Sequence, residues 1–272
     1  MPELPEVEIA RRNLARWLGR AAVARAEADR TRIFRGADRS AFTRLRGRLT
    51  FARRRGKVLL LGFEGNRGFL SHLGMTGKWV RRRSGQPEPY SRARLVLDDG
   101  SVLHYRDPRL FGRIEPAPAG ALERLPAVRA LGPDPLLDAV DGPTLEAALG
   151  TSRVPVKVAL LDQRRLAGLG NIHAAEALWR AKVSPLRPAR SLRPEEWRRL
   201  ARAISAGIRF ALGREDSEEV PYVEEPGTPN PFRVYGRAGK PCPRCRTVVR
   251  SVRQAGRSTY FCPRCQPARR KR

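Results

Sequence analysis

The stretch CPRCRTVVRSVRQAGRSTYFCPRC, residues 242–265, contains all four cysteines of the chain. They form two C-x2-C pairs on either side of residues 246–261, a spacing typical of a zinc ribbon with four thiolate ligands. Two disulfides are the alternative, but the closeness of each pair and the lack of a secretion signal in the sequence disfavour them. We therefore expect one structural Zn2+ per chain, bound by Cys242, Cys245, Cys262 and Cys265.

The residues between the two pairs alternate apolar and polar positions around the sequence QAGR at 254–257. This pattern predicts a β-hairpin with Arg257 at its tip. Four protein ligands would leave the metal no open position, so the expected zinc is structural and takes no part in catalysis.

The charge of the chain indicates a polyanionic partner. Its 272 residues include 55 Lys and Arg against 27 Asp and Glu, which gives a formal net charge of +28. Such an excess repels itself in a compact state, and binding to a polyanion relieves the repulsion and releases counterions. Nucleic acid is the leading candidate. An anionic membrane is the second, but we expect no membrane association, because no apolar run reaches the roughly 18 residues of a membrane span. Charge alone also fits ribosomal or histone-like binding, so it indicates no reaction.

The first half of the chain is expected to form a β-sandwich or barrel-like domain behind one helix. Apolar residues recur at helical spacing over residues 7–18. Short strand-like runs follow to about residue 115, and Asp99-Gly100 between two of them is a strong hairpin signal.

The second half is expected to be helical. A break rich in proline and glycine at 131–137 precedes helical patterns from 141 to about 213, and residues 214–236 are acidic and proline-rich, as in a loop. The expected fold class is therefore α+β. The predicted domains are an N-terminal β-sandwich at 1–131, a helical domain at 132–236, a zinc finger at 237–267 and a basic tail at 268–272.

The N-terminal sequence MPELPEVE, residues 1–8, is suited to covalent chemistry. Removal of Met1 would leave Pro2 with a free secondary amine, a nucleophile toward an aldehyde-like carbon such as C1′ of a sugar. The iminium that forms would acidify the neighbouring carbon, and Glu3 and Glu6 could then donate and accept protons. An ordinary frayed terminus is the alternative.

MPELPEVE resembles the N-terminus of bacterial formamidopyrimidine-DNA glycosylases of the Fpg/Nei family, and further motifs follow in the order of that family. They are RRRGKVLLL (53–61), SHLGMTG (71–77), YRDPRLFG (105–112), LLDQRRLAGLGNIHAAEAL (160–178) and the zinc hairpin. Each motif alone has a plainer interpretation, such as a solvated strand start, a tight turn or a helix–turn–helix packing unit. Together they cover nearly the whole chain, and the resemblance implies that the helical domain is a helix–two-turn–helix DNA-binding domain.

The resemblance implies catalytic roles for residues near the reacting sugar. Pro2 would be the Schiff-base nucleophile and Glu3 the acid, with Glu6 as a second proton-transfer group. Lys57 would contact phosphate and assist β-elimination. Arg257 would bind the phosphates beside the lesion and take part in δ-elimination.

The resemblance also implies a set of DNA contacts. Met75, Arg109 and Phe111 would fill the space left by the extruded nucleotide, with the arginine at the orphaned base and the phenylalanine between bases. His72 would lie near a backbone phosphate. Asn171 is expected to cap the helix that follows it and to grip phosphate together with the helix N-terminal amides.

The implied function is that of a bifunctional DNA glycosylase and AP lyase of base excision repair, which removes 8-oxoguanine and formamidopyrimidine and then cleaves by β,δ-elimination. The expected partner is double-stranded DNA with damaged bases or abasic sites. We expect a monomer in the bacterial cytoplasm, associated with the nucleoid. The alternatives are an endonuclease VIII-like enzyme for oxidised pyrimidines and a non-catalytic reader of abasic or bent DNA, although Pro2, Glu3, Glu6 and Lys57 together disfavour a pure reader.

Departures from the family pattern affect the choice of lesion. Leu110 stands where some members have a second arginine, and Tyr90 and Arg92 lie where members often have a histidine-rich phosphate contact. Residues 214–236 lack the loop pattern that caps the flipped base in 8-oxoguanine readers. The sequence therefore leaves the preferred lesion and the opposite base open.

Overall fold

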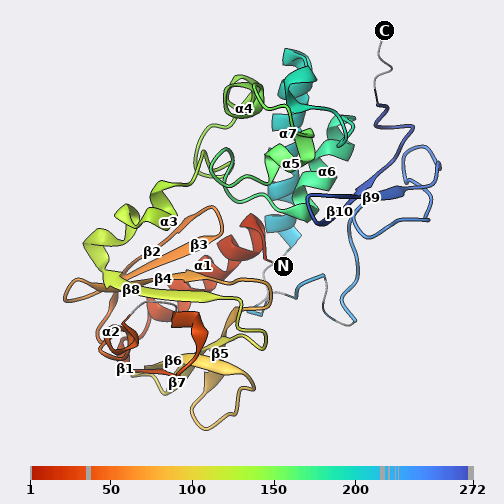
Figure 1. The fold of residues 1–272 in the computed structure, drawn as a ribbon. Coiled ribbons are helices and arrows are strands. Elements are labelled where there is room, and N and C mark those ends of the chain that lie inside the picture. Colours follow the sequence, from red (N-terminus) through yellow and green to blue (C-terminus); the bar gives the residue numbers. More distant parts are fainter. Residues whose placement is uncertain are drawn as a thin grey trace. The chain divides into compact units, whose positions relative to one another are not determined.

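The computed structural model of the chain describes residues 2–34, 38–214, 218–219, 221–223, 225 and 227–268. The chain divides into two compact units. The N-terminal unit consists of Met1–Arg129 with Arg214–Thr228, and the C-terminal unit consists of Ala130–Gly213 with Pro229–Arg272 (Figure 1). Residues 214–228 thus belong to the N-terminal unit, whereas the sequence grouped them with the helices. Of the predicted basic tail at 268–272, only Ala268 lies within the described residues.

Two antiparallel sheets form the centre of the described part of the N-terminal unit. The first sheet has the strand order β1 (Val23–Ala28), β6 (Ser91–Leu97), β7 (Ser101–Arg106) and β5 (Lys78–Arg83). The second has the strand order β2 (Leu49–Arg55), β3 (Val58–Phe63), β4 (Arg67–His72) and β8 (Arg113–Pro118). The predicted turn at Asp99-Gly100 joins β6 to β7. The predicted β-sandwich is confirmed.

The two sheets share one apolar core. Leu59, Leu61 and Phe69 of the second sheet belong to the same buried cluster as Leu95 and Leu103 of the first. Along β6, buried residues alternate with partly exposed ones, as expected for a strand that packs on one face only. This core fixes the ends of the strands, from which the candidate site residues project.

Helix α1 (Leu4–Leu18) packs against β2 and begins at Leu4 rather than at the predicted Val7. Proline is tolerated in the first turn of a helix, so Pro5 does not delay the start. The Glu6 side chain accepts the Glu3 backbone N–H at 2.8 Å and so satisfies one of the free donors at the helix start. The shorter helices of this unit are η1 (Arg32–Phe34), α2 (Arg39–Thr43), η2 (Ala119–Arg124) and α3 (Pro126–Arg129).

The C-terminal unit is helical and ends in a hairpin. Its elements are α4 (Gly142–Leu149), α5 (Val156–Leu160), α6 (Asn171–Ala181), η3 (Ala189–Ser191), α7 (Pro194–Arg214), β9 (Arg250–Gln254) and β10 (Arg257–Phe261). Turns over 161–170 connect α5 to α6, and Gly168 there has a φ of +94°, which favours glycine. None of the helices in the described ranges is both long and apolar enough to cross a membrane.

Residues beside the hairpin β9–β10 share a small core with helix α6, and Tyr260 of β10 packs against that core. Ala175 and Trp179 of α6 lie in one buried cluster with Val234, Val249 and Cys242. The zinc-finger region is therefore packed onto the helical part of its own unit and does not depend on cysteine chemistry alone.

Candidate active site and nucleic-acid interface

The start of helix α1 brings together the predicted nucleophile and acids. Pro2 and Glu3 are both buried, and Glu3 is only 1% exposed. Since Glu6 accepts the Glu3 N–H, the two carboxylates are tied to one helix end directly after Pro2. Met1 lies outside the described residues, so its removal stays a prediction.

A buried ion pair links helix α1 to the turn that carries Lys57. Arg54 Nε lies 3.2 Å from a carboxylate oxygen of Glu8, and Arg54 Nη1 donates to the Gly56 carbonyl oxygen at 2.8 Å. Burial raises the pKa of Glu8, but Arg11, Arg12 and Arg54 outweigh it, so the pKa is lowered overall and the carboxylate stays charged. Neither Glu8 nor Arg54 was among the site residues predicted from the sequence. Their signal was a carboxylate on the apolar face of α1 and the middle arginine of the RRRGK motif.

His72, the last residue of β4, is neutral at physiological pH. Burial, and then the positive charges of Lys57 and Arg113, lower its pKa from 6.5 to about 4. Its Nδ1 accepts the Gly74 backbone N–H at 3.0 Å. The ring proton therefore lies on Nε2, from which it can be donated to an acceptor such as a phosphate oxygen.

The motifs SHLGMTG and YRDPRLFG pack against each other. Gly74 has a φ of +66°, and a Cβ atom there would lie 2.5 Å from the Phe111 carbonyl carbon. Thr76 Oγ1 donates to Asp107 at 2.8 Å, and the fully buried Asp107 also accepts the Gly112 N–H at 2.8 Å. These contacts place half-buried Met75 in the same turn region as the tip of the second motif.

The tip of the second motif presents Arg109 and Phe111 to solvent. Phe111 is 40% exposed, and the Arg109 guanidinium lies 4.8 Å from its ring centroid. Arg32 supports the tip by donating to the carbonyl oxygens of Arg109 and Leu110, each at 2.9 Å. An exposed aromatic ring held between arginines can stack on bases. Arg32 was not found by the sequence analysis, because it lies far away in the chain.

The prediction that Asn171 caps helix α6 is wrong. Gly170 is the N-cap residue, with an extended backbone, and Asn171 is the first helical residue. The Asn171 side chain accepts a hydrogen bond from Lys157 Nζ and donates one to the Ser258 carbonyl oxygen at 3.0 Å. Because Ser258 follows Arg257 in β10, Asn171 and Arg257 come together within the C-terminal unit.

Lys157 was also missed by the sequence analysis. It is fully buried in α5, and its Nζ lies 3.4 Å from the Ser258 carbonyl oxygen, close to the N-terminus of α6. A lysine beside the N-terminus of a helix favours an anion there. The only signal in the sequence was one cation within the apolar run VKVALL at 156–161.

The four cysteines converge on one point. Their Sγ atoms all lie within 4.8 Å of one another. The Cys245–Cys262 and Cys242–Cys265 sulfur distances are 3.4 and 4.0 Å, far longer than the roughly 2.05 Å of a disulfide. Four thiol ligands at these distances fit one structural Zn2+, as predicted.

Trp179 contacts this sulfur cluster directly, and Arg244 packs on Trp179. The indole Nε1–H of Trp179 points to the Cys242 sulfur at 3.4 Å. Arg244 stacks on the indole, with its guanidinium carbon 4.1 Å from the ring, and donates to the Trp179 carbonyl oxygen at 3.1 Å. Donors outside the ligand sphere orient the ligands of a metal site.

Three protein-family models match the chain in order. They are the formamidopyrimidine-DNA glycosylase N-terminal domain over residues 1–114, the formamidopyrimidine-DNA glycosylase H2TH domain over 131–219, and the zinc finger found in FPG and IleRS over 239–268. The formamidopyrimidine-DNA glycosylase of Thermus thermophilus is 42% identical over 273 residues, which cover 98% of each chain. That of Brucella ovis is 39% identical over 292 residues, which cover 98% of this chain and all of its own.

Solved structures agree with this match. The crystal structure of the MutM (Fpg) protein from Thermus thermophilus aligns with a TM-score of 0.82 at 39% identity and covers 97% of this chain and 98% of its own. The Lactococcus lactis Fpg in complex with abasic-site DNA aligns with a TM-score of 0.87 at 28% identity, over 98% of this chain and 100% of its own. The fold, the order of the domains and the identity over the full length lead to one conclusion: the chain belongs to the formamidopyrimidine-DNA glycosylase family.

Proposed function

We propose that this protein is a bifunctional DNA glycosylase and AP lyase that removes oxidised purines through a Schiff base on Pro2 and then cleaves by β,δ-elimination. The proposal is carried by the full-length match together with the position of the matched residues at the start of α1. The chain matches formamidopyrimidine-DNA glycosylases over its full length, and the buried start of α1 has a proline followed by two carboxylates.

The chemistry begins with Pro2, whose nitrogen becomes a free secondary amine when Met1 is removed. The nitrogen attacks C1′ of the damaged nucleotide, the C1′–N bond to the base breaks, and Glu3 supplies a proton as the sugar ring opens. The product is an iminium between Pro2 and the open sugar. It withdraws electrons from C2′, so that a C2′ proton can leave to a base such as Glu6.

Loss of the C2′ proton expels the 3′-phosphate, and a second elimination expels the 5′-phosphate. Together they leave a gap with phosphorylated ends. Lys57 and Arg257 are proposed to stabilise the departing phosphates, because cations lower the energy of a leaving anion. The zinc ion serves the fold of the hairpin that carries Arg257 and takes part in no step.

The DNA contacts are proposed for two groups of residues. Met75, Arg109 and Phe111 would fill the space vacated by the extruded nucleotide, which offsets part of the few kcal/mol that unstacking costs. His72, as a neutral donor, and Asn171, beside buried Lys157, would bind backbone phosphates. The enzyme would act as a monomer on double-stranded DNA in the bacterial cytoplasm, at the nucleoid.

Oxidised pyrimidines are a second candidate substrate class. One of the similar structures is the wild-type Lactococcus lactis Fpg in complex with DNA that contains an oxidised pyrimidine; it aligns with a TM-score of 0.88 at 28% identity. Duplexes with a single 8-oxoguanine, formamidopyrimidine or oxidised pyrimidine would separate the two classes by their relative rates of excision.

Borohydride trapping on abasic-site DNA tests the proposal. Protein that begins at Pro2, as verified by intact mass, should form a covalent adduct with the DNA, because borohydride reduces the iminium to a stable amine. Protein that retains Met1 should form none. Binding without an adduct would indicate a non-catalytic reader. Unchanged cleavage after chemical blocking of the Pro2 nitrogen would refute the mechanism.

A further inference from the structure

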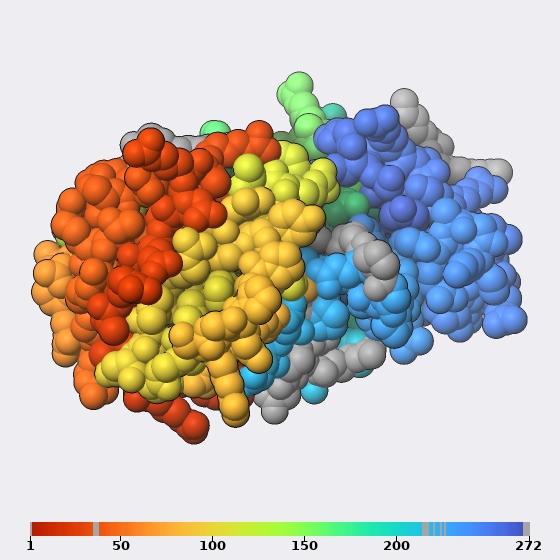
Figure 2. Space-filling model, turned by 90° about the horizontal axis from the view of Figure 1, so that it is seen from below, coloured from red at the N-terminus to blue at the C-terminus, as the bar shows by residue number. Residues whose placement is uncertain are grey.

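An acidic strap lies on the first sheet of the N-terminal unit. We use this name for the described residues Glu218, Glu219, Tyr222 and Glu225, which follow helix α7 in the chain but pack in the N-terminal unit. In the space-filling view, the blue residues of this part of the chain lie against the gold residues of β5 and its surroundings (Figure 2). The strap brings carboxylates onto a strongly basic protein.

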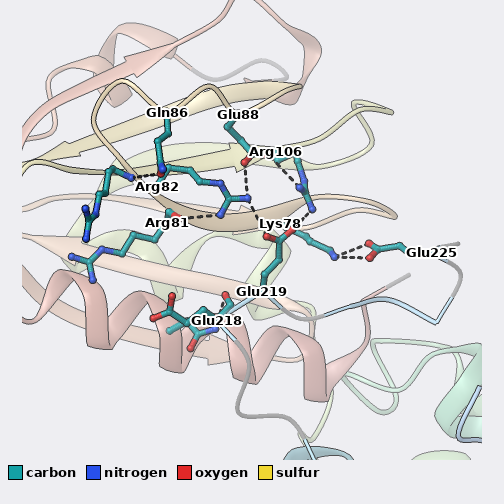
Figure 3. A network of polar contacts seen from close by, with 11 residues as sticks. Lys78, Arg81, Arg82, Gln86, Glu88, Arg106, Glu218, Glu219 and Glu225 are labelled. Carbon is teal, nitrogen blue, oxygen red and sulfur yellow. Dashed lines mark hydrogen bonds and ion pairs between the residues drawn. The ribbon is translucent and has the colours of Figure 1, made fainter. Parts of the chain in front are cut away.

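The carboxylates of the strap pair with three cations of β5 and β7, which we call the cation trio: Lys78, Arg82 and Arg106 (Figure 3). Glu225 lies 2.6 Å from Lys78 Nζ. Glu219 lies 3.1 Å from Arg82 and also pairs with Arg106. The side chain of Lys78 is only 5% exposed, so its ammonium has little access to water in place of the carboxylate.

The two arginines of the trio have a second acidic partner of a different kind. Glu88, whose side chain is 2% exposed, lies 2.7 Å from Arg82 and 3.1 Å from Arg106. Glu219, by contrast, is 34% exposed and comes from a distant part of the chain. Glu88 therefore fixes the direction of both guanidinium groups, while Glu219 occupies the outer position, which another anion could take.

Tyr222 holds the strap next to the candidate active site. Its hydroxyl donates to the Gly77 carbonyl oxygen at 2.7 Å, at the end of the SHLGMTG motif, and its ring lies 4.4 Å from Lys78 Nζ. Burial, and then the Glu6 carboxylate, raise the pKa of Tyr222 well above its usual value, so the phenol stays protonated and Glu6 lies nearby. At the other end of the strap, Asn13 of α1 donates to the Glu218 carbonyl oxygen at 3.2 Å.

We infer that the cation trio is a binding site for DNA phosphate, and that the strap occupies it until DNA displaces the carboxylates. The guanidinium fork binds the oxygens of a carboxylate and of a phosphate in the same bidentate way, and an ammonium group attracts either anion as a point charge. Partly exposed ion pairs contribute little stability each, whereas DNA adds the release of its own counterions. The inference rests on the proposed function only in that DNA is the ligand.

Binding to an undamaged duplex tests the inference without any turnover. The variant E219Q/E225Q neutralises both strap carboxylates that contact the trio and leaves Glu88 in place. It should bind the duplex about fivefold more tightly than the wild type, since it loses the competing ion pairs of two partly exposed carboxylates. Fluorescence anisotropy with a labelled duplex at fixed salt measures the change. Thermal unfolding of each variant verifies that the chain is folded.

Two controls separate competition from a general gain in charge. E123Q/E195Q makes the same change in net charge at exposed glutamates outside the site and should alter affinity less than twofold, an effect of long-range charge alone. Adding K78Q, R82Q and R106Q to E219Q/E225Q should abolish the gain, because the phosphate would lose its cations. Equal gains in the two double variants, or no gain in E219Q/E225Q, would overturn the inference. A failure of borohydride trapping would leave these binding results untouched, so the two proposals fail separately.

Discussion

Two segments of the chain that follow helix α7 are held in place by different kinds of contact. The acidic strap is bound to the N-terminal unit by ion pairs with the cation trio and by the Tyr222 hydroxyl. The zinc module, residues 239–268, is held by four thiolates and by a small core around Trp179 and Val249. Neither segment has an apolar core comparable to that of the β-sandwich. The strap therefore depends on its ion pairs and hydrogen bond, and the zinc module depends on its metal ligands.

The difference indicates which segment can change its partner. Partly exposed ion pairs are worth about 0–1 kcal/mol each and weaken with salt, so a stronger anion can replace them. Structural zinc contributes roughly 10–16 kcal/mol of apparent binding free energy in small zinc domains. The strap is therefore suited to exchange, and the zinc module is suited to holding Arg257 in a fixed position.

The largest expected effect is the loss of the metal. Cys262→Ser removes a buried ligand, and three thiolates hold zinc far less tightly than four. We expect the bound zinc, measured by elemental analysis, to fall from one per chain to almost none. DNA affinity should fall more than tenfold, because Arg257 would lose its place in β10.

Ser251→Ala is the control for this substitution. Ser251 is exposed on strand β9 of the same hairpin, and its loss should leave both zinc content and DNA binding unchanged. If the Cys262→Ser protein kept its DNA affinity without zinc, the zinc module would be no more firmly held than the strap, and the comparison would fail.

The next effect concerns Glu176, a buried carboxylate whose place, unlike that of Glu219, cannot be taken by an anion from solution. Buried Glu176 of α6 accepts the backbone N–H groups of Arg233, Val234 and Tyr235 at 2.8–3.0 Å, just before the zinc module. Glu176→Ala would leave these donors without their acceptor. We expect the free energy of unfolding to fall by about 2–3 kcal/mol.

Urea unfolding of the purified protein measures this loss. Glu195→Ala, an exposed position at the start of α7, is the matched control and should change the free energy of unfolding by less than about 0.5 kcal/mol. A loss for Glu176→Ala no larger than that of the control would mean that the segment 233–235 is held by packing alone.

The zinc module could be predicted from the sequence because its signals are local. The two C-x2-C pairs and the turn at QAGR define the ligands and the hairpin within residues 242–265, and the structure brings all four sulfurs together. The sandwich was predictable for a similar reason, since alternating apolar residues mark its strands. The start of α1 was placed late, because a carboxylate cap at Glu3 and Glu6 does not show in apolar periodicity.

The strap could not be predicted, because it depends on contacts across the chain. Residues 214–236 appear as an acidic loop, and nothing local indicates that Glu219 meets Arg106 of β7. Lys157 and Arg54 were missed for the same reason, as each finds its partner only in the fold. The cap expected at Asn171 was wrong because Gly170 takes that position and frees the amide to bind Ser258.

A smaller effect is expected from the support of the zinc site by Trp179. Trp179→Phe keeps an aromatic ring beside Arg244 but removes the N–H that points to Cys242. A hydrogen bond of this kind is worth about 1 kcal/mol, so we expect zinc to be released to a chelator about fivefold faster. Trp197→Phe is the matched control, since Trp197 is also buried, in α7, and its release rate should equal that of the wild type. Equal rates for all three proteins would show that the indole contributes only packing.

The smallest expected effect is the response of the strap to pH. Burial raises the pKa of Glu219, but its hydrogen bonds and ion pairs with Arg82 and Arg106 outweigh this, so the pKa lies below its ordinary value of 4.5. A carboxylate whose pKa is lowered on docking stabilises the docked state at any pH above its ordinary pKa. This contribution is lost as the pH falls through the lowered pKa. Carbon-13 NMR of the Glu219 carboxyl should therefore give a midpoint below 4.5, and R82Q/R106Q should restore the ordinary value. If phosphate takes the place of Glu219, saturating duplex DNA should raise the titration midpoint of Glu219 as the arginine substitutions do. A titration midpoint that stays low in the complex would mean that the strap remains docked and that the cation trio does not bind DNA phosphate.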